Sequence, residues 1–323
     1  MVLLRFGPIL LASALGGIAV DASAQNYPSR VVRMMVAFSA GSGTDTVGRI
    51  IAGGLTEVFG QQVIVDNRAG ASGNIGAELI AKAAPDGYNL FLANITYAAN
   101  ASLYRNLSYD LQRDFAPVTQ FATGPYIVVI HPSLPSKSIG DFVKLTKAKP
   151  GAVIYSSGGS GTATFLAAEL FKAQAGVNMM HIPYKAGAEA LSAVLSGEVA
   201  THFAPIATAL PQVKHGRLRA LAVTSAQRLA LAPEYATIAE SGYPGYEFGN
   251  WYGLMVPAKT PREAIATLHS ATLKTLNNPT VSRRLTDLGY IAVGDQPEEF
   301  GAYIKSQTEK LAKIIKSLNL TAD

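Results

Sequence analysis

The sequence predicts an α/β fold in two lobes. Strand-like apolar runs alternate with helical apolar stripes, the links between them are short, and the whole pattern restarts near residue 126. Such alternation means parallel pairing through right-handed crossovers, hence a sheet flanked by helices. The chain has 323 residues, of which 49% are hydrophobic. That length allows two lobes of roughly 100–200 residues each, and that composition excludes intrinsic disorder.

The first unit is expected to read strand, helix, strand, helix, strand. A strand at Val31–Phe38 precedes a helix at Thr44–Phe59, whose apolar residues recur at helical spacing. A short strand at Gln62–Asp66 leads through a turn-rich segment to a helix from about Asn74 to Ala84. A third strand follows at Leu90–Ala93.

The second unit repeats this order, and a helical C-terminal part follows it. Its expected strands are Tyr126–Ile130, Val153–Ser156, Val199–Phe203 and Leu218–Val223. Its expected helices are Ile139–Lys149 and Thr162–Ala175. After the apolar run Trp251–Val256 the chain is expected to be helical to its end, with helices starting at Pro261, Pro279 and Pro297.

The first residues predict a cleaved secretory signal over residues 1–24. Arg5 precedes an apolar stretch, Phe6–Val20, and Ala22–Ala24 then supplies the small-x-small cleavage pattern, with Gln25 as the first mature residue. The stretch is shorter than the ~20 residues that a spanning helix needs. The chain has no cysteine, which excludes disulfides, thiol catalysis and a lipid anchor on cysteine. We therefore expect a secreted, unanchored protein of the Gram-negative periplasm.

Composition also bears on partners and cofactors. The net charge of +5 includes no cluster of Lys and Arg, so a nucleic-acid-binding surface is not expected. The five histidines are widely spaced and form no metal-ligand pair, and no cofactor-binding motif is present. We expect no metal and no cofactor.

A glycine-rich turn, Phe38–Asp45, lies between a predicted strand and a predicted helix. Small residues let the backbone approach a ligand closely, and the first amides of the helix have no partner within it. Together with the helix dipole they make a site for an anion. The alternative is an ordinary turn and helix cap, in which Asp45 is purely structural.

A second turn of this kind, Ser156–Thr162, has the same context in the second unit. Neither turn matches a phosphate-binding loop or a dinucleotide fingerprint. The second also fails as a nucleophile elbow, because Thr162 stands where the last glycine belongs. Binding without chemistry is the better interpretation. Two such turns facing each other across a cleft at the carboxyl ends of the strands suit a small dicarboxylate.

At these same residues the chain resembles the substrate-binding proteins of tripartite tricarboxylate transporters, the Bug family of periplasmic receptors. The resemblance covers nearly the whole mature chain and is carried by Tyr27–Arg30, Phe38–Asp45, Asp66–Gly76, Ala83–Tyr88, Asp114–Val118, His181–Lys185, Gly216–Thr224 and Trp251–Leu254. It implies a two-lobed, type II periplasmic binding protein (a Venus flytrap), each lobe a mixed, mostly parallel sheet flanked by helices. Lobe one would comprise residues 25–124 and 247–323, and lobe two residues 125–246.

The resemblance also implies the ligand-binding residues and the partner. In lobe one they are Phe38, Ser39, Gly41, Ser42, Gly43, Thr44, Asp45, Asn94, Thr96 and Tyr97. In lobe two they are Ser157, Gly158, Ser160, Gly161, Thr162, Tyr184, Phe203 and Ala204, with Trp251 near the hinge. The partner would be a membrane transporter of the tripartite tricarboxylate type, and the receptor itself a monomer.

Two departures from the family pattern concern the ligand. Ser39, Ala40 and Ser42 replace two prolines and a glycine of the usual first turn. Ala204 stands where family members often carry an Asp that faces a ligand ammonium. Since an ammonium buried without a counter-charge is costly, we expect a dicarboxylate without an amino group, aliphatic or aromatic.

Three aromatic residues, Tyr97, Phe203 and Trp251, are expected to form an apolar wall for the middle of such a ligand.

Two other functions are compatible with the sequence. A sensor subunit of a two-component system would bind the same ligand and need the same closing cleft. A secreted serine hydrolase would use Ser157 or Ser160 as its nucleophile, but no sequence signal supplies the base. We therefore expect a binding protein and not an enzyme.

Overall fold

The computed structural model describes residues 2 and 27–322, so the predicted signal segment lies almost wholly outside the described residues. Its strands are β1 (Val32–Val36), β2 (Val63–Asn67), β3 (Asn89–Asn94), β4 (Phe115–Ile130), β5 (Ile154–Ser157), β6 (Met180–Pro183), β7 (Thr201–Pro205), β8 (Arg219–Val223), β9 (Gly249–Pro257) and β10 (Ile291–Ala292). They form a ten-stranded sheet in the order β2-β1-β3-β9-β4-β7-β5-β6, with β10 and β8 also paired to β4.

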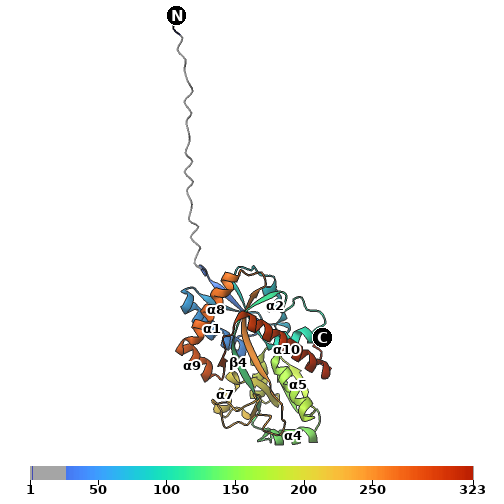
Figure 1. The fold of residues 1–323 in the computed structure, drawn as a ribbon. Coiled ribbons are helices and arrows are strands. Elements are labelled where there is room, and N and C mark those ends of the chain that lie inside the picture. The colour runs from blue at the N-terminus through green and yellow to red at the C-terminus, as the bar shows by residue number, and fades with distance from the viewer. Residues whose placement is uncertain (1, 3–26, 323) are drawn as a thin grey trace.

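Helices surround this sheet in two groups (Figure 1). They are α1 (Gly43–Phe59), the short 3₁₀ helix η1 (Ala71–Gly73), α2 (Asn74–Ala81), α3 (Ile95–Leu103), α4 (Ile139–Ala148), α5 (Ala163–Ala175), α6 (Gly187–Leu195), α7 (Ile206–Lys214), α8 (Arg262–Asn277), α9 (Pro279–Asp287) and α10 (Pro297–Ser317). No helix among the described residues combines the length and the apolar character needed to cross a membrane.

The strand β4 joins the two halves of the molecule. Its first part, Phe115–Pro125, pairs with β9, and its second part, Tyr126–Ile130, pairs with β7 and β8. We call the half that contains β1–β3, β9, β10, α1–α3 and α8–α10 lobe one, and the half that contains β5–β8 and α4–α7 lobe two. The two-lobed α/β fold predicted from the sequence is thereby confirmed.

The sheet of each lobe is mixed, with a larger antiparallel share than the sequence predicts. Parallel pairs join β1 to β2 and β3, and β5 to β6 and β7. Every antiparallel pair involves β4 or β9. Of these two strands, β4 runs from lobe one into lobe two, and β9 is the first strand after the chain returns to lobe one.

Most predicted elements are present, and their ends follow ordinary capping chemistry. The helix α1 begins after Ser42, whose side chain accepts a hydrogen bond from the amide of Asp45, and ends at Gly60 in the left-handed conformation. Pro279 and Pro297 occupy the first turns of α9 and α10, as predicted. The run Trp251–Val256 lies within β9.

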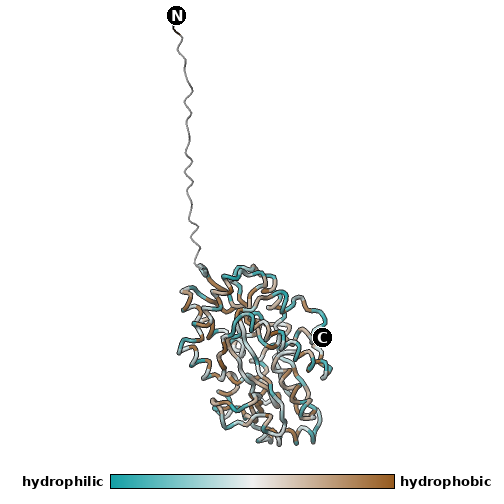
Figure 2. Tube along the Cα trace, viewed as in Figure 1, coloured by the Kyte–Doolittle hydropathy of each residue, from teal (hydrophilic) through white to brown (hydrophobic). Residues whose placement is uncertain are grey.

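The core packs on both faces of the sheet. Its largest apolar cluster extends through both lobes and includes Phe91, Trp251 and Phe203. Trp251 is 1% exposed, and its ring meets Phe300 of α10 edge-on with the centroids 5.5 Å apart. Hydrophobic and hydrophilic stretches alternate along the outer helices (Figure 2), as expected where one face of each helix covers the sheet.

Candidate functional site

The first glycine-rich turn connects β1 to α1 and brings the start of that helix to a cavity. Ser42 caps the helix, its Oγ accepting a 3.2 Å hydrogen bond from the amide of Asp45. Gly41 has φ +79°, a conformation that glycine adopts without strain. Gly43 and Thr44, the first two residues of α1, line the cavity. Because the first amides of a helix lack acceptors within it, this end carries partial positive charge.

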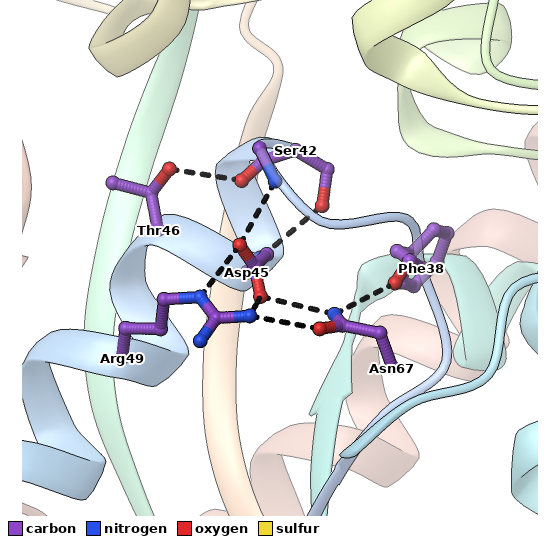
Figure 3. A network of polar contacts seen from close by, with 7 residues as sticks. Phe38, Ser42, Asp45, Thr46, Arg49 and Asn67 are labelled. Carbon is purple, nitrogen blue, oxygen red and sulfur yellow. Dashed lines mark hydrogen bonds and ion pairs between the residues drawn. The ribbon is translucent and has the colours of Figure 1, made fainter. Parts of the chain in front are cut away.

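The carboxylate of Asp45 stabilises this turn through hydrogen bonds (Figure 3). Its carboxylate accepts hydrogen bonds from the Gly41 amide at 2.9 Å, from Asn67 Nδ2 at 3.0 Å and from Arg49 Nε at 3.0 Å. Burial by itself would raise the pKa of Asp45, but these hydrogen bonds outweigh it and hold the pKa below its ordinary value. The side chain is 4% exposed and does not line the cavity. The structure thus favours the structural alternative for Asp45 over direct ligand contact.

The second glycine-rich turn connects β5 to α5 and is braced by its own side chains. Thr162 Oγ1 donates to the Gly159 carbonyl at 2.7 Å, and the Gly158 amide donates to Thr164 Oγ1 at 3.1 Å. Gly159 and Gly161 have φ +125° and +87°, respectively. The start of α5, including Thr162 and Thr164, lines the same cavity as the start of α1.

Ser157, in the second turn, lies 2.7 Å from His181, measured between Oγ and Nε2. The His181 ring packs between the rings of Tyr155 and Phe165, at centroid distances of 4.7 and 4.9 Å. Burial lowers the pKa of His181 to about 4. This spacing is that of a nucleophile and its base. However, Ser157 is 0% exposed, does not line the cavity, and its Oγ accepts from the Gly159 amide at 3.1 Å. The pair therefore fixes the turn.

The two lobes touch beside the cavity. Ser72 Oγ donates to the Ser160 carbonyl at 2.7 Å, and the Ala163 amide donates to Thr96 Oγ1 at 3.3 Å. Thr96 belongs to α3 of lobe one, whereas Ser160 and Ala163 belong to lobe two. The structure is therefore one in which the lobes have closed on each other.

The cavity between the lobes measures about 370 Å³. Lobe one contributes Phe38, Gly41, Ser42, Gly43, Thr44, Asn94, Thr96, Asn250 and Tyr252. Lobe two contributes Tyr126, Gly158, Thr162, Ala163, Thr164, Gly187, Ala188, Leu191, Ser192, Leu195, Pro205, Thr208 and Gln212. None of these lining residues has a charged side chain. Nor do the described residues contain a group of three His, Asp or Glu side chains able to hold a metal ion.

Nine residues predicted to bind ligand line this cavity: Phe38, Gly41, Ser42, Gly43, Thr44, Asn94, Thr96, Gly158 and Thr162. The other ten do not line it: Ser39, Asp45, Tyr97, Ser157, Ser160, Gly161, Tyr184, Phe203, Ala204 and Trp251. Among these, Ser160 and Gly161 face lobe one at the closure contact, and Tyr184 OH donates to Glu198 at 2.8 Å.

The three aromatic residues expected to form an apolar wall lie in the core instead. Tyr97 and Phe203 are 0% exposed and Trp251 is 1% exposed. Phe203 packs on Phe171 with ring centroids 5.5 Å apart, and Tyr97 packs on Phe91 at 4.8 Å. Because these three side chains are buried among other apolar side chains, they fill the core and do not face the cavity.

The sequence analysis missed the α6 and α7 side of the cavity. Five of its lining residues recur along one face of α6, at Gly187, Ala188, Leu191, Ser192 and Leu195. Helical spacing was the available signal, but nothing in that pattern distinguishes a face on a cavity from a face on the core.

Comparisons with known proteins agree with this arrangement. A sequence model described as the tripartite tricarboxylate transporter family receptor matches residues 47–320. The UPF0065 protein in the tcbD-tcbE intergenic region of Pseudomonas sp. (strain P51) is 35% identical over 298 residues, which cover 92% of this chain and 89% of that protein. Protein BugT of Bordetella pertussis is 33% identical over 310 residues, 95% of this chain and 94% of BugT.

Three solved structures share the fold. The R. palustris protein Rpa4515, solved with adipate, has a TM-score of 0.89 and 32% identity over 92% of this chain and 99% of its own. The periplasmic binding protein BugD has a TM-score of 0.88 and 31% identity over 91% and 99%. MatC from Rhodopseudomonas palustris, with bound malate, has a TM-score of 0.85 and 27% identity over 90% and 100%.

Proposed function

The chain belongs to the tripartite tricarboxylate transporter receptor family, and from that membership we propose that it captures a small organic acid between its lobes and delivers it to a membrane transporter of the tripartite tricarboxylate type. The ligand we propose is a dicarboxylate without an amino group, aliphatic or aromatic.

The observation that carries this proposal is a cavity bordered by the starts of α1, α5 and α6 and by no charged side chain. Helix starts attract carboxylates through their amides and their dipoles. An ammonium group in the same cavity would have no carboxylate beside it and would lose its hydration without compensation. Rpa4515 and MatC, solved with adipate and malate, support a dicarboxylate by similarity.

The division of the chain into residues 25–124 plus 247–323 and residues 125–246 belongs to this proposal. It is supported by the change of partner along β4, where Pro125 pairs with β9 and Tyr126 with β7. We also propose that residues 1–24 direct the chain to the periplasm and are removed there, and that the receptor acts as a monomer.

We further propose that the protein binds its ligand without transforming it. Ser157 and His181 have the spacing of a nucleophile and a base, but Ser157 is buried and bonded to its own turn. A Ser157→Ala variant that still binds ligand, with neither variant nor wild type turning over ester or amide substrates, supports this assignment.

A thermal-shift screen of residues 25–323, followed by calorimetric titration, tests the ligand class. The panel contains succinate, adipate, phthalate, benzoate, citrate, aspartate and glutamate. Because a ligand that binds only the folded state raises the melting temperature, dicarboxylates should give the largest shifts and the two amino acids none. Binding of aspartate or glutamate without any dicarboxylate would contradict the proposal.

Delivery to a transporter is tested separately, by capture of membrane proteins on the immobilised receptor with and without bound acid. Recovery of a transporter subunit that depends on the acid supports transport. Recovery of a histidine kinase in its place would assign the protein to signalling.

A further inference from the structure

We infer that Tyr290 is a positioning residue for ligand capture, because its hydroxyl group holds and polarises the peptide group between Gly43 and Thr44 at the start of α1. The inference deepens the proposed function and rests on it. Tyr290 does not line the cavity, so it acts on the bound carboxylate from the core and through the backbone, without touching the ligand.

The hydroxyl of Tyr290 donates a hydrogen bond of 2.9 Å to the carbonyl of Gly43, a residue 247 positions earlier in the chain. Gly43 is the first residue of α1, and Tyr290 lies between α9 and β10 and is 3% exposed. Burial raises the pKa of Tyr290 well above its ordinary value, so the hydroxyl keeps its proton and remains a donor. The bond thus ties the C-terminal part of lobe one to the first glycine-rich turn.

The acceptor of this bond belongs to the same peptide group as a ligand-facing amide. The carbonyl of Gly43 and the N–H of Thr44 are the two ends of one planar unit. Thr44 lines the cavity, and the first amides of a helix have no acceptor within it. Among the described residues, no bond of the turn occupies the Thr44 amide either. Because a hydrogen bond received at a carbonyl polarises the peptide group, the Tyr290 hydroxyl makes this amide a stronger donor to a carboxylate.

Packing fixes the ring of Tyr290 where the lobes are joined. The ring meets that of Tyr252, a cavity residue, edge-on with the centroids 5.4 Å apart. On its other contact it lies against Gly124 of β4, where a Cβ would stand 2.7 Å from the ring Cδ1. The hydroxyl is therefore in place before a ligand arrives, and binding pays no entropy to order it.

Both ends of the hydrogen bond also lie against the same corner of lobe two. A Cβ on Gly43 would stand 2.9 Å from Pro205 Cβ. A Cβ on Gly289, the residue before Tyr290, would stand 2.8 Å from Cγ2 of Ile206, which follows Pro205. These contacts exist because the lobes are closed, so the Tyr290 bond sits where closure brings lobe two onto the ligand-binding turn.

Tyr290→Phe tests the inference, because it removes the hydroxyl and keeps the ring. Dissociation constants of succinate, adipate and phthalate are measured by calorimetric titration, and the unfolding free energy by urea. We expect each dicarboxylate that binds the wild type to bind the variant about fivefold more weakly. Tyr246→Phe is the matched control, since the buried Tyr246 hydroxyl also donates to a backbone carbonyl, that of Ala167, at 2.9 Å. It should lose a comparable amount of stability and bind with unchanged affinity.

The two kinds of failure are distinguishable. Wild-type affinity in Tyr290→Phe, whatever its loss of stability, would mean that the hydroxyl is purely structural; the inference would fall and the proposed function would stand. An equal loss of affinity in Tyr246→Phe would also overturn the inference, because the effect would then follow from stability. If the wild type binds no acid of the panel, the proposed function and the inference fail together.

A nuclear magnetic resonance measurement of the Thr44 amide gives a second test, part of which needs no variant. In the wild type, the amide proton of Thr44 should move downfield when a dicarboxylate binds, since it donates to a charged acceptor. In ligand-free Tyr290→Phe it should lie upfield of its wild-type position, and in Tyr246→Phe it should not move. A bound dicarboxylate that leaves the Thr44 resonance of the wild type unmoved would overturn the inference.

Discussion

The hydroxyl of Ser72 donates a 2.7 Å hydrogen bond to the carbonyl oxygen of Ser160, 88 positions further along the chain. This bond joins the two lobes, because Ser72 lies in η1 of lobe one and Ser160 in the second glycine-rich turn. Ser72 adopts φ +52° and ψ +36°, a left-handed conformation that is uncommon for residues other than glycine. A residue in a costly backbone conformation whose side chain reaches the other lobe is placed to stabilise closure.

Replacing Ser72 with alanine should weaken ligand binding. The variant loses one hydrogen bond that exists only between closed lobes, worth about 1 kcal/mol, which corresponds to about fivefold in the dissociation constant. Calorimetric titration with the acid that gives the largest thermal shift measures the effect. Ser270→Ala, on the exposed side of α8, is the control and should bind like the wild type. Unchanged affinity in Ser72→Ala would mean that the contact contributes nothing to closure.

Replacing Asp45 with asparagine should destabilise lobe one at neutral pH. The carboxylate holds Gly41, Asn67 and Arg49, and its loss should cost about 2 kcal/mol of unfolding free energy, allowing for the half-exposed Arg49. The folded-state pKa of Asp45 is lowered, so this stabilisation is present above the unfolded pKa and disappears as the pH falls through the folded pKa. Urea unfolding at about pH 7 and about pH 3 should therefore show a difference between variant and wild type that shrinks in acid. Asp287→Asn, at the exposed end of α9, serves as the control.

His202 should make the protein less stable as the pH falls below about 6.5. It is 0% exposed, its Nδ1 donates to the Ser156 carbonyl at 2.8 Å, and burial lowers its pKa to about 4. The unfolded chain takes up a proton near pH 6.5, so stability falls between about pH 6.5 and pH 4, by about 3 kcal/mol for this residue.

The variant His202→Asn tests the contribution of His202 to this loss of stability, because the asparagine amide retains a donor near the position of Nδ1 and does not titrate. Its unfolding free energy, measured by urea unfolding from about pH 7 to about pH 4.5, should fall less steeply than that of the wild type. His215→Asn is the matched control, since His215 Nδ1 also bonds a backbone carbonyl, that of Pro211, but is exposed. Parallel curves for His202→Asn and wild type would contradict the assignment.

The sequence predicted the fold better than the site because the two depend on different signals. Strands, helices and both glycine-rich turns follow from periodicity, capping residues and glycine, which act locally. The sequence analysis did not predict helix α3, because its N-cap, Asn94, and its polar residues Thr96 and Asn100 mask a helix that tertiary packing stabilises. The helix α7 was also not predicted, because Pro205 stands at its N-cap and Pro211 lies within it.

Side-chain direction is what the sequence did not supply. Phe203 and Ala204 alternate along β7, and both are 0% exposed, Phe203 in the core cluster with Phe171 and Ala204 in the cluster with Ile127. When both faces of a strand are buried, the hydrophobic pattern cannot tell which face borders a cavity. The lining residue is Pro205, one position further on, where the strand ends.

Gly43 and Gly53 lie in the same helix and should respond in opposite ways to alanine. A Cβ on Gly43 would stand 2.9 Å from Pro205 Cβ, a residue of the other lobe, whereas a Cβ on Gly53 would meet nothing within 4 Å. Gly43→Ala should therefore hinder closure without harming lobe one, and weaken ligand binding by tenfold or more, about 1.4 kcal/mol. Gly53→Ala should raise the unfolding free energy by up to about 1 kcal/mol, because alanine is the better helix former, and leave affinity unchanged. Titration calorimetry and urea unfolding of both variants separate the two effects. A dissociation constant for Gly43→Ala equal to that of the wild type would show that ligand capture does not require the close contact between α1 and Pro205.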